Sequence, residues 1–326
     1  MLAIVVVSYN TCSLLRACLK SVFDGLVRFE PGEKSGESQP AGEVWVVDNA
    51  STDGSPEMVR REFPTARLIL NSENRGFAAA NNQVLQRLLQ SDSDTAVKPD
   101  AVLLLNPDTV VCDDALWQMF HALMADPRVA VVGACLTYPD GRFQHSAFRF
   151  PDLFQVFFDF FAVHHRLIES RLNGRYPRSL YDQGRPFAID HPLGAALMAR
   201  REAIEQVGLL DERFFMYCEE IDWCMRFKRH GWQVVCAPQA RIVHYAGQST
   251  RQFREKMFVA LWKSRFLLFQ KHYPAVFRRI AHWLVAAGLR RKLKEARAAA
   301  ARGEIDQTEV DQLESARRQI MELSVL

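Results

Sequence analysis

Aliphatic runs alternate with segments of helical spacing along the first half of the chain. Residues 2–8 are apolar without interruption up to a serine, which predicts a strand covered on both faces. Leu15, Leu19 and Val22 follow at helical spacing, and a loop rich in Gly, Pro, Glu and Ser spans residues 25–42. The pattern then predicts strands over 44–47, 67–70, 101–105 and 129–136, and helices after Ser55, over 78–90 and over 115–125. Strands alternating with helices of this length form a mostly parallel sheet, so the predicted fold class is α/β.

The second half is less regular. Residues 150–165 are rich in phenylalanine, and residues 173–186 are typical of a long loop. Helices are then predicted over 200–207 and 219–230, and a strand over 232–236. From about residue 253 the pattern is helical to the end, with a break at Gly303.

Composition narrows the class of protein. Of 326 residues, 48% are apolar and 24% are charged, which excludes disordered, collagen-like and disulfide-scaffold proteins. The net charge of +3 does not indicate a nucleic-acid partner. The seven cysteines show no Cys-x-x-Cys spacing, which favours reduced thiols. Since the chain has no basic leader and no apolar run of membrane-spanning length, we expect a cytoplasmic protein that spans no membrane.

Polar side chains follow three of the predicted strands at the point where each strand ends. They are Ser8-Tyr9-Asn10, the run from Asp48 to Ser55, and Asn106-Pro107-Asp108. Ligands of doubly wound sheets bind beyond the carboxyl ends of the strands, so the three segments predict one binding edge. Each segment alone could be only a turn or a helix cap.

The sequence also excludes two classes of nucleotide-binding protein. A dinucleotide-dependent dehydrogenase needs a Gly-x-Gly-x-x-Gly turn, and residues 8–12 contain no glycine. A P-loop signature occurs nowhere in the chain. A bound diphosphate would therefore need another source of positive charge, and Asp108, directly after a buried strand, could hold a divalent cation for that purpose.

An acidic run begins the helix predicted over 219–230. Glu219, Asp222 and Arg226 share one face of that helix, while Glu220 points about 100° away. Acids at a helix start can serve only the helix dipole, so a catalytic role does not follow from their position alone. His244 could be a metal ligand or a surface residue.

Seven segments that together cover roughly residues 1–250 match one known family in their order and spacing. They are residues 5–10, 46–55, 74–81, 104–108, 194–198, 214–226 and 243–249. Through them the chain resembles the family 2 inverting glycosyltransferases, and most closely the bacterial rhamnosyltransferase branch. The resemblance implies a nucleotide-diphospho-sugar transferase A-type fold, which is Rossmann-like with a mostly parallel mixed sheet. It also implies a catalytic domain over 1–250, with nucleotide-binding and acceptor-binding halves over 1–110 and 111–250, and a helical C-terminal extension over 251–326.

The resemblance also implies roles for individual residues. Residues that would bind the nucleotide sugar are Ser8, Tyr9, Asn10, Asp48, Arg75, Gly76, Asn106 and Asp108. Asn106-Pro107-Asp108 stands where the family has its Asp-x-Asp metal motif, with Asn106 in place of the first acid. Asp108 and His244 would be ligands of a divalent cation, Mg²⁺ or Mn²⁺. Glu220 matches the general base, which is aspartate in many relatives.

The C-terminal extension is strongly basic over residues 278–302, where eight basic residues stand against one acid for a net +7. Apolar residues lie among them, including Ile280, Trp283 and Leu284, so a basic amphipathic helix on anionic lipid is one interpretation. The alternative is a helical hairpin, because residues 303–323 carry a net −4 and could pair with the basic stretch.

The sequence therefore predicts an inverting, metal-assisted glycosyltransferase that moves L-rhamnose from dTDP-L-rhamnose onto a cell-surface glycan or polyprenyl-linked saccharide. A UDP donor with another sugar and a non-catalytic nucleotide-sugar-binding protein are the alternatives. A sugar nucleotidyltransferase would need a Gly-rich loop with Lys or Arg after the first strand, which is absent. Peripheral contact with the cytoplasmic face of the inner membrane is expected through the basic helices, and no oligomeric state is predicted.

Overall fold

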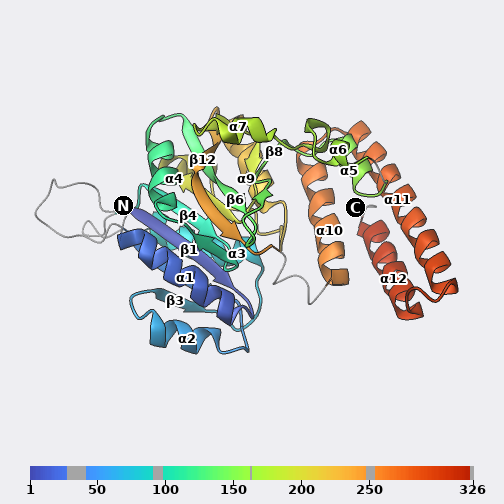
Figure 1. Ribbon diagram of the computed structural model, residues 1–326, viewed down its shortest axis with the longest axis horizontal. Coiled ribbons are helices and arrows are strands. Elements are labelled where there is room, and N and C mark those ends of the chain that lie inside the picture. The colour runs from blue at the N-terminus through green and yellow to red at the C-terminus, as the bar shows by residue number, and fades with distance from the viewer. Residues whose placement is uncertain (28–41, 91–97, 162–163, 247–253, 324–326) are drawn as a thin grey trace, which may run out of the picture. The chain divides into compact units, whose positions relative to one another are not determined.

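The computed structural model describes residues 1–27, 42–90, 98–161, 164–246 and 254–323. The chain forms two compact units (Figure 1). The first comprises Met1–Phe148, Tyr176–Phe215 and Glu219–Ser249; the second comprises Arg149–Arg175, Met216–Cys218 and Thr250–Leu326. The helical unit thus includes residues 149–175 in addition to the predicted extension. The functional division of the chain into catalytic domain and extension stays a prediction.

A mixed sheet forms the centre of the first unit. Its strands are β1 (Leu2–Ser8), β2 (Gly42–Asp48), β3 (Arg67–Leu70), β4 (Ala101–Leu105), β5 (Thr109–Val111), β6 (Val129–Thr137), β7 (Phe143–Gln144), β9 (Phe187–Ala188), β11 (Ala196–Arg200) and β12 (Gln233–His244). The main order is β3-β2-β1-β4-β11-β6-β12-β5, and β8 (Ala147–Phe148) and β10 (His191–Pro192) make a separate pair. Pairs β3/β2, β2/β1, β1/β4 and β6/β12 are parallel, whereas β11 runs antiparallel to both of its neighbours. The predicted α/β, mostly parallel mixed sheet is confirmed.

Helices cover both faces of this sheet. They are α1 (Cys12–Val27), α2 (Ser55–Glu62), α3 (Phe77–Leu89), α4 (Ala115–Met124), α7 (Arg178–Asp182), α8 (Arg201–Val207) and α9 (Glu219–Arg229). Side chains of α1, α2 and α4 share one core with Leu2, Ile4 and Val6 of β1. Alternate β1 residues point to the opposite face, where α3 packs against β1 and β2. Because both faces are covered, β1 is buried along its whole length, as its uninterrupted apolar run predicted.

The structure corrects several expectations from the sequence. Residues 178–182 within the predicted long loop form α7, where the buried Tyr181 accepts a hydrogen bond from the Ala147 N–H at 2.9 Å. The strand predicted over 232–236 continues to His244, past an irregularity between Ala237 and Arg241. Strands β5 and β11 were not predicted, because each is short and lacks alternation. The predicted loop over residues 28–41 lies outside the described residues.

The second unit consists of helices. They are α5 (Leu153–Phe158), α6 (His165–Ile168), the 3-10 helix η1 (Arg171–Asn173), α10 (Arg254–His272), α11 (Ala275–Ala301) and α12 (Gln307–Leu323). The Phe-rich segment supplies part of the core, where Phe160 stacks on Trp262 and packs against α11. Gly288 makes this packing possible, because a Cβ there would lie 2.2 Å from the Phe160 ring. Helices α11 and α12 pack on each other, as the hairpin alternative predicted, and an Arg297–Glu314 ion pair of 3.1 Å joins them.

Two further expectations concern cysteines and membrane spans. All seven cysteines are free in the structure, and their redox state stays a prediction. Among the residues that the structure describes, no helix has the length and apolar character needed to cross a bilayer.

Candidate active site

Register places the three polar strand ends at one edge of the sheet. Ser8 at the end of β1 lies opposite Asp48 at the end of β2, and Val6 of β1 lies opposite Leu105, the last residue of β4. The segment that begins at Asn106 therefore starts beside the Ser8-Tyr9-Asn10 segment. The expectation that these strand ends converge is confirmed, because β1, β2 and β4 are adjacent and parallel.

The loops after β1 and β2 are tied to each other. Asn10 has a left-handed φ of 53°; its N–H donates to Ser51 Oγ at 2.9 Å, and its Oδ1 accepts from the Thr52 N–H at 2.8 Å. The buried Ser8 hydroxyl lies 3.0 Å from the Thr11 hydroxyl just before α1. The side chains of Ser8 and Asn10 thus shape the loop, whereas the Tyr9 ring is 37% exposed beside it.

Asp48 keeps one carboxylate oxygen unpaired in the interior. Its Oδ1 accepts a hydrogen bond from the Ser51 N–H at 2.8 Å, while its Oδ2 is shielded from solvent and has no hydrogen-bond partner. Leaving a buried charged acceptor unsatisfied is costly, so such an oxygen is a natural contact for an N–H or O–H of a ligand.

The turn before α3 closes against the same strand end. The Asn49 side-chain amide donates to the Gly76 carbonyl at 3.2 Å, and the Phe77 N–H donates to the Phe215 carbonyl at 2.8 Å. Gly76 has a φ of +82°, and a Cβ at this position would lie 2.4 Å from the Phe215 oxygen, so only glycine fits. Arg75 is exposed next to it.

Asp108 and His244 meet where β5 pairs with the end of β12. His244 lies opposite Thr109 in the register, and its Nε2 is 3.5 Å from Asp108 Oδ1; both residues are buried. On the other side of the ring, Nδ1 lies 3.3 Å from the Gln144 side-chain oxygen. A proton on Nδ1 would donate to that oxygen, and Nε2 would then face the carboxylate without a proton.

This donor set fits a divalent cation. One carboxylate oxygen and one imidazole nitrogen face each other, and the Gln144 side chain lies against the other ring nitrogen. No cluster of three or more His, Cys, Asp or Glu side chains with metal-binding spacing occurs among the described residues. Two protein ligands suffice for a cation that shares its remaining positions with substrate phosphates and water.

A chain of contacts links the Asp108 strand end to Glu220. The Asn106 N–H donates to the Ala195 carbonyl at 2.9 Å, one residue after Gly194. A Cβ at Gly194 would lie 3.5 Å from the carboxyl carbon of Glu220, so this residue directly adjoins the acid. Glu220 is therefore brought to the same edge as Asp108, although more than 100 residues separate them in the chain.

Glu219 and Glu220 begin α9 as a pair of acids with raised pKa values. Burial raises the pKa of Glu220 to about 7, against the backbone N–H groups of Glu220 and Ile221, which lower it. Burial and the adjacent Glu220 charge raise the pKa of Glu219 well above its usual value. Glu219 Oε2 is also buried without a hydrogen-bond partner. A carboxyl that titrates near neutral pH is well suited to general acid–base catalysis.

Two further charged residues of α9, Asp222 and Arg226, hold the segment before the helix. Arg226 Nε donates to Asp222 Oδ2 at 2.9 Å, and its other nitrogens donate to the carbonyls of Val207 and Leu209. Asp222 and Arg226, predicted to share a face, thus form an ion pair in which Asp222 is buried and Arg226 partly buried.

Two neighbours of the site had no predicted role. Gln144 contacts the His244 ring, and Gly194 adjoins Glu220. Gly194 stood inside one of the seven matching segments without an assigned function, and nothing in the local pattern around Gln144 signalled a contact 100 residues away. Of the segment over residues 243–249, residues 247–249 lie outside the described residues.

Comparison with known proteins identifies the class. The family model "Glycosyl transferase family 2" matches residues 3–208, and the chain belongs to that family. Over 256 residues the chain is 28% identical to the N-acetylglucosaminyl-diphospho-decaprenol L-rhamnosyltransferase of Mycobacterium tuberculosis, a match that covers 76% of this chain and 80% of the relative. It is also 28% identical to the rhamnosyltransferase WbbL of Escherichia coli over 51% of this chain and 60% of that protein.

Solved structures share the fold. A mannosyltransferase from Pyrobaculum calidifontis, in complex with GDP-Man and Mn²⁺, has a TM-score of 0.54 at 18% identity, over 99% of this chain and 86% of its own. GalNAc-T7 with UDP, GalNAc and Mn²⁺ has a TM-score of 0.53 at 14% identity, over 75% of this chain and 43% of its own. The first unit is a nucleotide-diphospho-sugar transferase A-type fold, and the protein is a glycosyltransferase.

Proposed function

We propose that this glycosyltransferase moves L-rhamnose from dTDP-L-rhamnose onto a lipid-linked saccharide, with inversion at the anomeric carbon. The single observation that supports a nucleotide-sugar site best is the convergence of Asp48, Asp108 and Glu220 at one sheet edge, with an unpaired buried oxygen on Asp48. The rhamnosyl donor and the lipid-linked acceptor are proposed because two relatives are named rhamnosyltransferases and one of them acts on a diphospho-decaprenol.

The loops after β1 and β2 would bind the nucleoside. Asp48 Oδ2 accepts a hydrogen bond from an N–H of a pyrimidine base or an O–H of the ribose, which satisfies the unpaired oxygen. Tyr9 and the backbone of Ser8 and Asn10 would contact the nucleoside, and the exposed Arg75 beside Gly76 would bind the nucleotide phosphates. A thymidine or uridine nucleotide serves these contacts equally, so a UDP-sugar donor is the second candidate.

Asp108 and His244 would hold a divalent cation, Mg²⁺ or Mn²⁺, with the backbone and side chain of Asn106 next to them. When bound, the cation neutralises the negative charge that develops on the departing diphosphate. Asp108 is the one acid of the Asn106-Pro107-Asp108 motif. Gln144 would accept a hydrogen bond from His244 Nδ1 and so leave Nε2 free for the cation.

Glu220 would be the general base. Its carboxylate takes the proton of the acceptor hydroxyl, the acceptor oxygen bonds to the anomeric carbon, and the bond from that carbon to the diphosphate oxygen breaks on the opposite face. The electron pair of the broken bond leaves with the nucleoside diphosphate. Glu220 carries the negative charge needed for this step above a pH of about 7, because its pKa is raised to about that value.

A lipid-linked acceptor also requires access to a bilayer, and we propose that the basic C-terminal helices make a peripheral contact with the cytoplasmic face of the inner membrane. Exposed arginines at 278, 279 and 290 and an exposed Trp283 on α11 support this contact.

A thermal-shift screen of dTDP-L-rhamnose, UDP-sugars and GDP-mannose, each with and without Mn²⁺, tests the donor. We expect the largest rise in melting temperature with dTDP-L-rhamnose plus Mn²⁺, because a ligand of the native state stabilises it. A larger rise with a UDP-sugar would mean that the donor is that UDP-sugar and not dTDP-L-rhamnose. No rise with any pyrimidine nucleotide would contradict the proposed site.

A further inference from the structure

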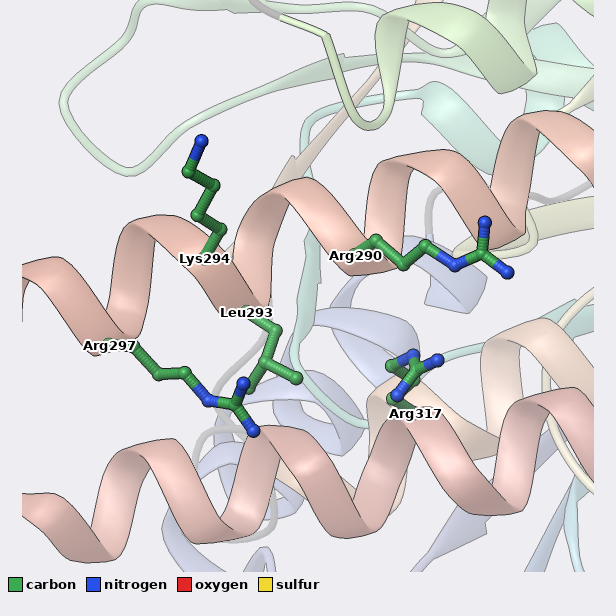
Figure 2. A pocket seen from close by; sticks show the side chains of 5 residues that line it. All are labelled: Arg290, Leu293, Lys294, Arg297 and Arg317. Atoms are coloured by element: carbon green, nitrogen blue, oxygen red, sulfur yellow. The ribbon is translucent and has the colours of Figure 1, made fainter.

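A hollow of about 310 Å³ lies in the helical unit between α11 and α12 (Figure 2). Its lining consists of four basic side chains and one leucine: Arg290, Leu293, Lys294, Arg297 and Arg317. Figure 2 shows Leu293 and Arg297 directed toward α12 and Arg317 directed toward α11, with Lys294 extending outward from α11. No acid contributes to this lining.

The charges of the hollow are only partly neutralised by the protein. Arg297 pairs with Glu314 at 3.1 Å, but Arg290, Lys294 and Arg317 make no ion pair with any residue that the structure describes. The Nε of Arg317 is shielded from solvent and has no hydrogen-bond partner. A buried guanidinium N–H without an acceptor is unfavourable, so the hollow lacks the acceptor oxygens that a bound anion would supply.

Two arginines near the hollow have acidic partners. Arg291 pairs with Glu295 at 2.7 Å on α11, and Arg302 pairs with Glu304 at 2.6 Å just after that helix. Unlike these two arginines, three of the four basic side chains in the lining have no acidic partner among the described residues.

Phosphate oxygens match this set of donors. A guanidinium binds two phosphate oxygens at once through paired N–H groups, and two or more arginines with a lysine provide a site for a doubly charged group. The hollow of about 310 Å³ is large enough for a phosphate group with its linked atoms.

The source of the phosphate follows from the rest of the same helix face. Val276, Ile280 and Trp283 precede Arg290, Lys294 and Arg297 at steps of three, four or seven residues, which puts all six on one side of α11. The three apolar side chains are 65%, 41% and 66% exposed. A phosphate ligand dissolved in water would leave this apolar half of the face unexplained, whereas a bilayer interface offers both phosphates and apolar surface, and it favours an exposed tryptophan.

We propose that the hollow between α11 and α12 binds the phosphate headgroup of an anionic membrane lipid, while Val276, Ile280 and Trp283 enter the lipid interface beside it. This inference rests on the proposed function only in that the helical unit meets a membrane. It adds a defined lipid-phosphate site to what could otherwise be diffuse attraction between charges.

Co-sedimentation of the full chain with vesicles at physiological salt tests the site, with phosphatidylcholine vesicles compared with vesicles that also contain phosphatidylglycerol. Arg290→Gln/Lys294→Gln replaces two exposed lining residues, and Lys263→Gln/Arg318→Gln is a control with the same loss of charge on exposed residues outside the hollow. We expect the first variant to lose about 30-fold in partitioning to the anionic vesicles, from about 1 kcal/mol per basic residue, and the control to lose less than about threefold. Equal losses in both variants would overturn the site in favour of diffuse electrostatics.

Arg317→Gln provides a second measurement. It removes the unpaired buried N–H, so we expect weaker binding to anionic vesicles without a lower melting temperature. A large fall in melting temperature with unchanged vesicle binding would assign Arg317 to the helix packing and contradict its role in the site.

Titration with inorganic phosphate separates the two sources of phosphate. Saturable phosphate binding that Arg290→Gln/Lys294→Gln weakens, combined with unchanged vesicle binding, would overturn the lipid assignment. Sugar transfer to a short-chain acceptor analogue in detergent-free buffer should be equal in all of these proteins, because the transferase site lies in the other unit. Absence of transfer even in the wild type would count against the proposed function and not against the lipid site.

Discussion

His244 Nε2 lies 3.5 Å from Asp108 Oδ1, and the opposite nitrogen of the same ring lies 3.3 Å from the side-chain oxygen of Gln144. The imidazole is thus held between a carboxylate and an amide, and a proton on the nitrogen that faces Gln144 would leave the other nitrogen free to bind a cation. Gln144 should therefore affect cation binding without touching the cation.

Gln144→Ala should weaken Mn²⁺ affinity by about 10- to 100-fold, since an outer partner that orients a histidine ligand typically contributes that much. The measurement is the Mn²⁺ concentration that gives half of the thermal shift produced by a saturating nucleoside diphosphate. His244→Ala should have at least as large an effect. Unchanged Mn²⁺ dependence in Gln144→Ala would show that the histidine ring does not serve as a ligand in this orientation.

Glu220→Gln should lower the rate of sugar transfer by about 100-fold or more, because the amide cannot take the acceptor proton. Nucleotide affinity should hardly change, since the donor contacts are made by the strand-end loops. Glu219→Gln, the same substitution one residue earlier, is the matched control and should keep most of the activity. Loss of transfer in Glu219→Gln together with near-normal transfer in Glu220→Gln would assign the base to Glu219.

The rate of transfer should rise with pH up to about 7 and then level off. Burial raises the pKa of Glu220 to about 7, so the carboxylate that accepts the proton becomes the major form only above that pH. The measurement is kcat/KM for the acceptor between pH 5 and pH 9 at saturating donor and cation. A flat profile across neutral pH would mean that Glu220 is not the group whose ionisation limits the reaction.

The raised pKa of Glu220 should also make the thermal stability of the protein depend on pH. A carboxyl whose pKa is raised in the folded state binds its proton more tightly there than in the unfolded state, so its contribution to stability is present at low pH and is lost as pH rises from about 4.5 to about 7. The glutamine side chain of the Glu220→Gln variant never ionises. The melting temperature of this variant should therefore rise relative to that of the wild type as pH rises over this range. A constant difference between the two proteins would contradict the raised pKa.

Gly76→Ala should destabilise the protein and weaken donor binding more than Gly208→Ala does. Both glycines have nearly the same backbone, with φ 82° and ψ 174° at Gly76 and φ 87° and ψ 178° at Gly208. This region costs about 1–3 kcal/mol for a residue other than glycine. At Gly208 a Cβ has no neighbour within 4 Å, whereas at Gly76 it would lie 2.4 Å from the Phe215 oxygen. Equal free energies of unfolding for the two variants would show that the Gly76 turn can move away from Phe215.

The sequence by itself determined the class of fold and the part of the site that lies at the ends of the parallel strands. Uninterrupted apolar runs such as residues 2–8 need cover on both faces, and polar residues directly after buried strands must gather where parallel strands end. These conclusions depend on local periodicity and on the geometry of parallel sheets. They could therefore be drawn for Ser8, Asp48 and Asp108 without knowing which other elements lie nearby.

Tertiary structure decided how the second half of the chain completes the site. Glu220 adjoins Gly194, and His244 faces Asp108 with Gln144 behind it, because β12 extends past an irregularity to pair with β5. Strands as short as β5 carry too few residues for a pattern, and contacts between residues 100 positions apart depend on register and helix packing. The same reason applies to α11, where packing buries Leu284 and Leu289 and leaves Trp283 and the basic residues exposed.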